Sequence, residues 1–117
     1  MRAARNFHAG LAAEDSVLRQ YAAAGYALLA RRFRGTRGEI DLILKRDDDL
    51  VFVEVKKSRS FDSALLRIGT AQIARIFATA EEFLGTQPDG SLTQTRFDVA
   101  LVDAHGQVQI VENALLQ

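Results

Sequence analysis

One stretch of the chain constrains its fold more than any other: G-E-I-D-L-I-L-K-R-D-D-D-L-V-F-V-E-V-K-K, residues 38–57. It contains two apolar runs with period-two alternation, Ile40–Leu44 and Leu50–Val55, joined by an acidic segment. Successive side chains of a strand point to opposite faces, so this pattern predicts a β-hairpin. A turn centred between Asp47 and Asp48 matches the apolar faces of the two strands, and this match specifies the register.

The predicted hairpin has an apolar face and a face that carries charges. Ile40, Leu42 and Leu44 are expected to share the apolar face of the first strand. Phe52 is expected to share the other face of the second strand with the charged residues that follow it. The charges are therefore placed by the same alternation that places the apolar residues.

The register brings two acidic residues together, because it places Asp41 opposite Glu54 and Glu39 opposite Lys56. Like charges directly opposite each other destabilise a sheet. Solvation accounts for most charges on strands, but two facing carboxylates are better explained by a divalent cation between them. Hard cations such as Mg²⁺ bind carboxylate oxygens together with waters and substrate phosphate.

The rest of the pattern predicts an α/β domain with a partly antiparallel sheet. The chain has 117 residues and no internal linker, repeat or low-complexity tract, so residues 1–117 are expected to form a single domain. The predicted elements are a helix over 11–24, a strand over 26–33, a flexible loop R-G-T-R-G over 34–38, the hairpin, a helix over 71–84, and a second hairpin with strands over 96–102 and 108–111.

Charge is distributed unevenly along the chain. The 15 basic and 15 acidic residues cancel, but residues 1–38 contain seven arginines and only two acids. A uniformly basic nucleic-acid-binding protein is excluded, whereas a local basic patch is not. The absence of cysteine excludes disulfides and thiolate zinc sites. No apolar run approaches the length that spans a membrane, so no membrane partner is expected and the cytoplasm is the expected location.

Glu14 is unusual for a helix residue because it points toward the apolar face that contains Val17, Leu18 and Tyr21. Its neighbour Asp15 can pair with Arg19 at the i+4 position, as ordinary surface residues do. Glu14 is either a boundary residue of the apolar stripe or a third acid that reaches the carboxylate pair.

Basic residues lie on both sides of the predicted hairpin. A solvated loop would explain them, but arginines beside a metal site also suit nucleic-acid phosphates, and binding is the preferred interpretation. Elsewhere, Arg96 and Asp98 share a strand face and are expected to form a local ion pair. The candidate phosphate-binding residues are Arg31, Arg32, Arg34, Arg37, Lys57 and Arg59.

Four motifs together resemble a known family: G-E-I-D at 38–41, F-V-E-V-K at 52–56, Q-I-A-R-I at 72–76 and R-F-D-V at 96–99. Asp41 followed by Glu54-Val55-Lys56 resembles the D…ExK motif of the restriction-endonuclease-like, or PD-(D/E)XK, superfamily. The chain resembles most closely the YraN family of small bacterial proteins, over nearly its whole length, and is similar to archaeal Holliday junction resolvases. The nominal proline before the Asp is replaced by Ile40.

The resemblance implies a restriction-endonuclease-like αβββαβ core, with a mixed sheet flanked by helices. It implies that Asp41 and Glu54 bind Mg²⁺ or Mn²⁺, that Lys56 acts on the attacking water and the phosphate, and that Glu14 is a further catalytic acid. Gln72 occupies a position where relatives commonly carry lysine, so a phosphate contact there would be weaker.

The expected function is therefore metal-dependent endonuclease cleavage of structured or single-stranded nucleic acid, with DNA rather than RNA as the expected partner. Resolvase-like relatives often dimerise, so a homodimer is open. Two alternatives also remain open. One is a non-catalytic nucleic-acid-binding module, and the other is an interaction subunit of a DNA-processing assembly.

Overall fold

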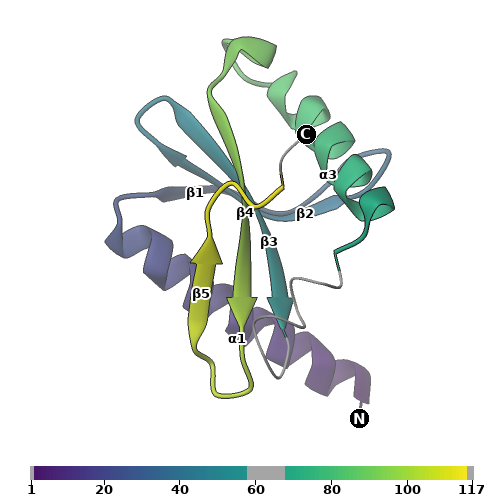
Figure 1. Cartoon of the computed structure of the whole chain (residues 1–117), viewed down its shortest axis with the longest axis vertical. Coiled ribbons are helices and arrows are strands. Elements are labelled where there is room, and N and C mark those ends of the chain that lie inside the picture. Colours follow the sequence, from purple (N-terminus) through teal and green to yellow (C-terminus); the bar gives the residue numbers. More distant parts are fainter. Residues whose placement is uncertain (1, 58–67, 116–117) are drawn as a thin grey trace.

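The computed structural model describes residues 2–57 and 68–115 and contains a mixed five-stranded sheet with two helices (Figure 1). This α/β arrangement is consistent with the restriction-endonuclease-like core that the sequence predicts. Neither helix of the described residues has the length and apolarity that a membrane span requires. The elements are α1 (Arg2–Ala23), β1 (Ala27–Arg34), β2 (Glu39–Arg46), β3 (Asp49–Lys57), α3 (Thr70–Leu84), a 3₁₀ turn η1 (Gly90–Leu92), β4 (Thr95–Val102) and β5 (Val108–Val111).

The strands lie in sequence order, β1-β2-β3-β4-β5. All neighbours are antiparallel except β3 and β4, which are parallel. A parallel pair needs a crossover connection, and α3 lies within the one that joins β3 to β4. The predicted order of helices and strands is confirmed, and the main difference is that α1 begins nine residues earlier than expected, at Arg2 rather than Leu11.

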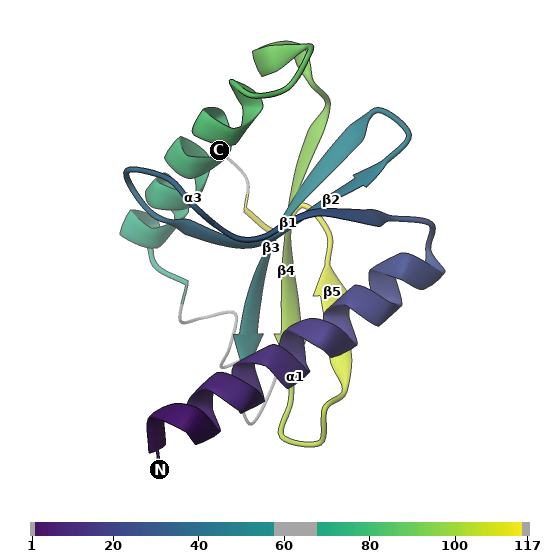
Figure 2. The same ribbon diagram turned by 180° about the vertical axis from the view of Figure 1, so that it is seen from behind.

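Each face of the sheet is covered by one helix. Val17 and Tyr21 of α1 pack against Leu42, Leu44 and neighbours on one face. Ile76, Ala80 and Phe83 of α3 pack against Ile43 and Phe52 on the other. Figure 2 shows α1 crossing in front of β3 to β5, seen from behind. Because both faces are covered, the central strands are apolar on both sides, which leaves charged side chains few buried positions.

The predicted hairpin register is confirmed over its closed half, which is the half next to the turn. Leu42 pairs with Val53 and Leu44 with Val51, and the two-residue turn over Asp47 and Asp48 is centred as expected. Asp47 has φ +55°, the left-handed conformation that tight hairpin turns require.

The open half of the hairpin differs from the prediction. The described β2–β3 ladder ends at Leu42–Val53, so the expected backbone pairs Asp41–Glu54 and Glu39–Lys56 do not form. Ile40 also lies in the apolar cluster under α3, not with Leu42 on the α1 side. The strands diverge here. The first residues of β2 stay paired with β1 and extend toward α3, whereas the last residues of β3 stay paired with β4 (Figures 1 and 2).

The change of face coincides with an irregular residue of β1. Arg32 has φ +55° and lies between the pairs Arg31–Leu42 and Phe33–Ile40, so it is opposite Asp41. A left-handed residue interrupts strand alternation, and Ala30 and Phe33 consequently pack against the same cluster. Alternation of side chains along β2 therefore predicts the wrong face for Ile40, because β1, the strand paired with it, does not alternate regularly at Arg32.

Candidate functional site

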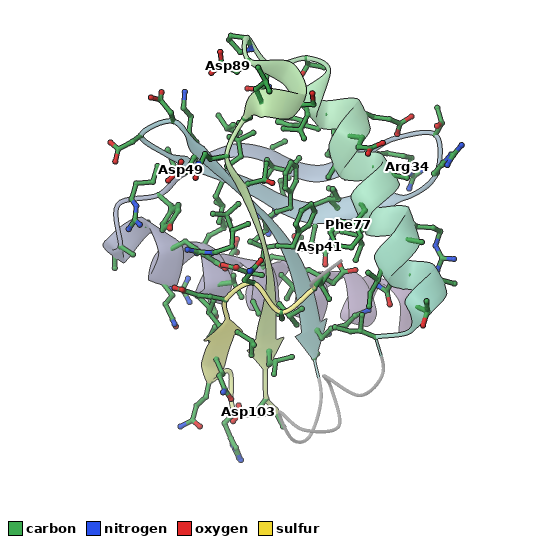
Figure 3. All side chains as sticks on the ribbon, turned by 45° about the horizontal axis from the view of Figure 1, so that its top comes forward. Arg34, Asp41, Asp49, Phe77, Asp89 and Asp103 are labelled. Carbon is green, nitrogen blue, oxygen red and sulfur yellow. The ribbon has the colours of Figure 1, made fainter. Side chains whose placement is uncertain are left out.

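The candidate site lies at the fork where β2 and β3 separate. Asp41 of β2 and Glu54 of β3 are both at this point, and their carboxyl groups are in hydrogen-bond contact. Figure 3 shows Asp41 beneath α3, among the side chains between helix and sheet. The two acids that the sequence predicts to face each other therefore meet, although through side chains and not through a backbone pair.

A backbone amide holds Asp41 in place. The Val55 N–H donates a hydrogen bond of 2.7 Å to Oδ2 of Asp41. This amide would have had a β2 carbonyl as its partner if the ladder had continued. The side chain of Asp41 thus satisfies a backbone donor that the fork leaves open, and the donor in turn orients the carboxylate.

Glu54 is buried, with 8% of its surface exposed. Burial, followed by the hydrogen bond with Asp41 and the negative charge of Asp41, raises the pKa of Glu54 to about 9. The charge of Lys56 and a hydrogen bond from Gln72 oppose this rise. Without a cation, this environment favours a protonated Glu54 next to Asp41, because two adjacent carboxylates out of water repel each other.

Gln72 reaches this pair from the first turn of α3. Its Nε2 donates a hydrogen bond of 2.6 Å to Oε2 of Glu54. The sequence pattern predicted only a weak phosphate contact for Gln72, and the structure instead gives it a direct contact with a candidate metal ligand. An amide donor holds a carboxylate without adding charge, whereas a lysine there would neutralise it.

Lys56 is half-buried and follows Glu54 at the i+2 position, so both side chains project from the α3 side of β3. Its charge lowers the pKa of Glu54. The role of Lys56 toward water and phosphate stays a prediction. Lys57 is exposed and ends the strand. The candidate phosphate ligand Arg59 lies outside the described residues.

Glu14 occupies a different environment from the one that the resemblance implies. It is 5% exposed and pairs with Arg31, at 2.9 Å, and Arg32, at 3.2 Å. The described contacts of Glu14 join it to these arginines and not to Asp41 or Glu54. Within residues 2–57 and 68–115, no three acidic or histidine side chains form a group able to hold a metal ion.

The predicted surface pair of Asp15 with Arg19 does not form among the described contacts. Asp15 pairs with Arg31 at 3.0 Å, and Arg19 donates to the hydroxyl of Ser16. The guanidinium of Arg31 lies between α1 and β1, so a contact across the fold replaces the local i+4 pair.

The arginines of the predicted basic cluster therefore differ in their surroundings. Arg31 and Arg32 are neutralised by the acids of α1. Arg34 is 81% exposed and pairs with Glu39 at 3.1 Å. Arg37 is exposed at the β1–β2 turn. The predicted flexible loop is a short turn that is held to α3, because the N–H and hydroxyl of Thr36 both donate to Glu82.

The predicted Arg96–Asp98 ion pair is present and is part of a buried network on the α1 side. Arg96 Nε lies 2.8 Å from Oδ1 of Asp98 and Nη2 lies 2.9 Å from Oδ2. Tyr21 donates to the same carboxylate at 2.7 Å, and so does the N–H of Asn113 at 2.9 Å. Burial and Asp98 raise the pKa of Tyr21 well above its usual range. The network joins α1, β4 and the C-terminal segment.

Two residues with roles near the site were not identified from the sequence. Glu82 anchors the β1–β2 turn, and Arg75 lies beside Gly38 of that turn. Helical spacing from Gln72 is the only local signal for either, since Arg75 is three residues and Glu82 ten residues further along α3.

Comparisons with known proteins agree over most of the chain. The model of "Uncharacterised protein family UPF0102" matches residues 13–102. A UPF0102 protein of Roseobacter denitrificans is 61% identical over 109 residues, which cover 93% of this chain and 84% of that protein. A UPF0102 protein of Ruegeria pomeroyi is 57% identical over 113 residues, covering 97% and 92%. A UPF0102 protein of Cereibacter sphaeroides is 50% identical over 109 residues, covering 93% of each chain.

Proposed function

Because the chain belongs to the uncharacterised protein family UPF0102, the restriction-endonuclease-like and Holliday junction resolvase-like YraN group, we propose that it is a metal-dependent nuclease. It hydrolyses phosphodiester bonds in structured or single-stranded nucleic acid. The observation that carries this proposal is the contact between the carboxyl groups of Asp41 and Glu54 at the fork of the sheet. A purely structural hairpin gains nothing from placing the buried Glu54 against the half-buried Asp41.

The donor set fits a hard divalent cation, Mg²⁺ or Mn²⁺. Asp41 and Glu54 would hold it, since both offer carboxylate oxygens and a cation would allow Glu54 to ionise beside Asp41, which the metal-free site opposes. When bound, such an ion lowers the pKa of a coordinated water and neutralises charge that develops on the phosphate. The remaining positions would be filled by water and substrate oxygens.

The chain's own groups orient this site. The Val55 N–H restrains Asp41, and the amide of Gln72 restrains Glu54, so both carboxylates are held before substrate arrives. Lys56 projects from the same side of β3 as Glu54 and supplies a cation for the phosphate oxygens, where negative charge increases during hydrolysis. In this proposal Glu14 has no direct contact with the reacting groups.

The test is cleavage of a panel of labelled DNA substrates, namely a four-way junction, a flap, a duplex and a single strand, with Mg²⁺, Mn²⁺ or chelator. Metal-dependent cleavage of at least one substrate is expected. Lys56→Ala should lose at least about tenfold in rate and keep most of its affinity, since removal of a transition-state donor costs about 100-fold or more in well-studied cases. Lys45→Ala, an exposed lysine of β2, is the matched control. Full activity of Lys56→Ala would exclude the role of that lysine.

One observation favours a second candidate function. Only two acidic side chains meet at the fork among the described residues, because Glu14 is engaged by Arg31 and Arg32. A site with two ligands binds metal weakly, so the fold could serve as a non-catalytic nucleic-acid-binding module. Binding without cleavage of any substrate in the panel, with either metal, would support this candidate.

A further inference from the structure

One side of α3 connects the carboxylate pair with the β1–β2 turn. Gln72, Arg75, Thr79 and Glu82 recur at helical spacing and so lie along one stripe of the helix. Gln72 contacts Glu54 at one end of the stripe. At the other end Glu82 accepts hydrogen bonds from Thr36. At 1.5 Å per residue the stripe is about 15 Å long, the rise of about four base pairs along duplex DNA.

Arg75 lies between these two ends. A Cβ atom added to Gly38 would come within 3.4 Å of the Cβ of Arg75 and 3.2 Å of the Thr79 hydroxyl, so this part of α3 packs closely against the turn. Arg37 immediately precedes Gly38 and lines a surface hollow with Ala78, Glu81 and Glu82 of α3. Arg37 and Arg75 thus come from different elements and meet at the β1–β2 turn, with Arg75 beside Gly38 and Arg37 one residue before it. The β1–β2 turn is next to α3 in both views of the fold (Figures 1 and 2).

The charge of these two arginines is not neutralised within the described part of the chain. Both are exposed, and neither forms an ion pair with a described residue. By contrast, the acids of α1 neutralise Arg31 and Arg32, and Glu39 pairs with Arg34. An arginine that already binds a buried carboxylate has to lose that partner before it can bind a phosphate, which costs free energy.

The turn that presents Arg37 is held in one conformation. The Gly35 N–H donates to the Gly38 carbonyl at 2.8 Å. Glu82 packs so closely on the turn that a Cβ at Gly35 would lie 1.8 Å from its Oε2, so a larger residue there would displace this carboxylate from Thr36. The conformational entropy of this turn is therefore lost when the protein folds and not when nucleic acid binds. Glu81 and Glu82 line the surface on one side of Arg37, so a phosphate would approach Arg37 from the side of Arg75 and not from these carboxylates.

We propose that the guanidinium groups of Arg37 and Arg75 bind successive phosphates of the nucleic-acid strand that leads to Asp41 and Glu54. The strand crosses the first half of α3 and passes the β1–β2 turn. Arg31 and Arg32, which the sequence pattern placed in the same cluster, are structural ligands of Glu14. This inference rests on the proposed function, because it concerns the substrate path of the same site.

The test compares Arg37→Gln/Arg75→Gln with wild type and with Arg19→Gln, an exposed arginine of α1, as the matched control. Binding of labelled duplex DNA, single-stranded DNA and single-stranded RNA is measured by fluorescence anisotropy in chelator, over a series of salt concentrations. Each lost phosphate contact should lower the log–log salt slope by about 0.9 on duplex, and affinity by about fivefold at about 0.15 M salt. The double variant should therefore lose about 25-fold in affinity, with an unchanged melting temperature. The probe for which the double variant loses the most affinity identifies the type of nucleic acid that follows this path.

The outcomes separate this inference from the proposed function. If wild type binds none of the three probes, the path is wrong, and the nuclease proposal is decided separately by the junction and flap substrates of the cleavage panel. If wild type binds and the double variant keeps its affinity and salt slope, the path over α3 is wrong while nucleic-acid binding stands. An equal loss in Arg19→Gln would also overturn the path, since it would indicate binding through diffuse positive charge.

Discussion

The carboxylate of Asp41 accepts a 2.7 Å hydrogen bond from the backbone N–H of Val55, two residues beyond Val53, where the β2–β3 ladder ends. At the point where the strands separate, a side-chain carboxylate therefore replaces a backbone carbonyl as the hydrogen-bond acceptor. The same carboxylate contacts Glu54, so the fork and the acid pair are one structural feature. Any change that closes the fork would remove the site.

The first prediction concerns metal binding by this pair. Asp41→Asn removes one charge and keeps an oxygen that can accept from Val55. In chelator, the variant should be as stable as wild type or more stable, because Glu54 no longer lies beside a negative charge that opposes its ionisation. Millimolar Mg²⁺ or Mn²⁺ should raise the melting temperature of wild type by mass action, and the variant should lose most of this rise. Thermal melts with and without metal, repeated in the presence of DNA, measure both effects. Equal responses of the two proteins would exclude Asp41 as a ligand.

The second prediction concerns pH. In the folded protein Glu54 holds its proton up to a pH of about 9, whereas in the unfolded chain it ionises near its ordinary value of 4.5. Between these values the folded state binds more protons. The free energy of unfolding in chelator should therefore fall as pH rises through this window, by at most about 1.4 kcal/mol per pH unit. Glu54→Gln should flatten this dependence. Urea unfolding across the window gives both curves, and parallel curves would contradict the predicted pKa shift.

The third prediction distinguishes a structural from a catalytic Glu14. Glu14→Gln removes the acid that Arg31 and Arg32 share, while Arg31 keeps Asp15, and should cost about 1–3 kcal/mol in the free energy of unfolding, reduced by the partial exposure of both arginines. Asp15→Asn, at the exposed neighbour, should stay within about 0.5 kcal/mol. The metal-induced rise in melting temperature should persist in Glu14→Gln. A variant of full stability that loses this metal response would instead indicate that Glu14 is a ligand.

The fourth prediction concerns the buried network under α1. Tyr21→Phe removes one of the donors to Asp98, a carboxylate with no exposed surface, and should cost about 1–3 kcal/mol. Tyr26→Phe is the control, because the Tyr26 ring packs on the Tyr21 ring and under Arg46 without a described hydrogen bond of its hydroxyl, and should change stability by about 0.5 kcal/mol or less. Chemical denaturation compares the two variants. Similar costs for both would indicate that ring packing, and not the Asp98 hydrogen bond, is the larger effect.

The sequence predicted the parts of the fold that depend on local alternation. The element order, the closed half of the hairpin, and the pair Arg96–Asp98 two residues apart all follow from period-two or period-3.6 spacing. The meeting of Asp41 with Glu54 was predictable for the same reason, since the hairpin turn brings them together whatever else packs around it.

Tertiary structure decided which charged side chains are paired within the protein and which are left to bind a ligand. The partners of Glu14, Arg31 and Asp15 depend on how α1 lies across β1, and no spacing within one element encodes that contact. The face of Ile40 depends on the left-handed Arg32 in a neighbouring strand. Arg37 and Arg75 are 38 residues apart and share a surface only because Glu82 holds the β1–β2 turn on α3. Alternation acts along one strand, whereas burial and ion pairing act between elements, so the first can be predicted from sequence and the second needs the packed fold.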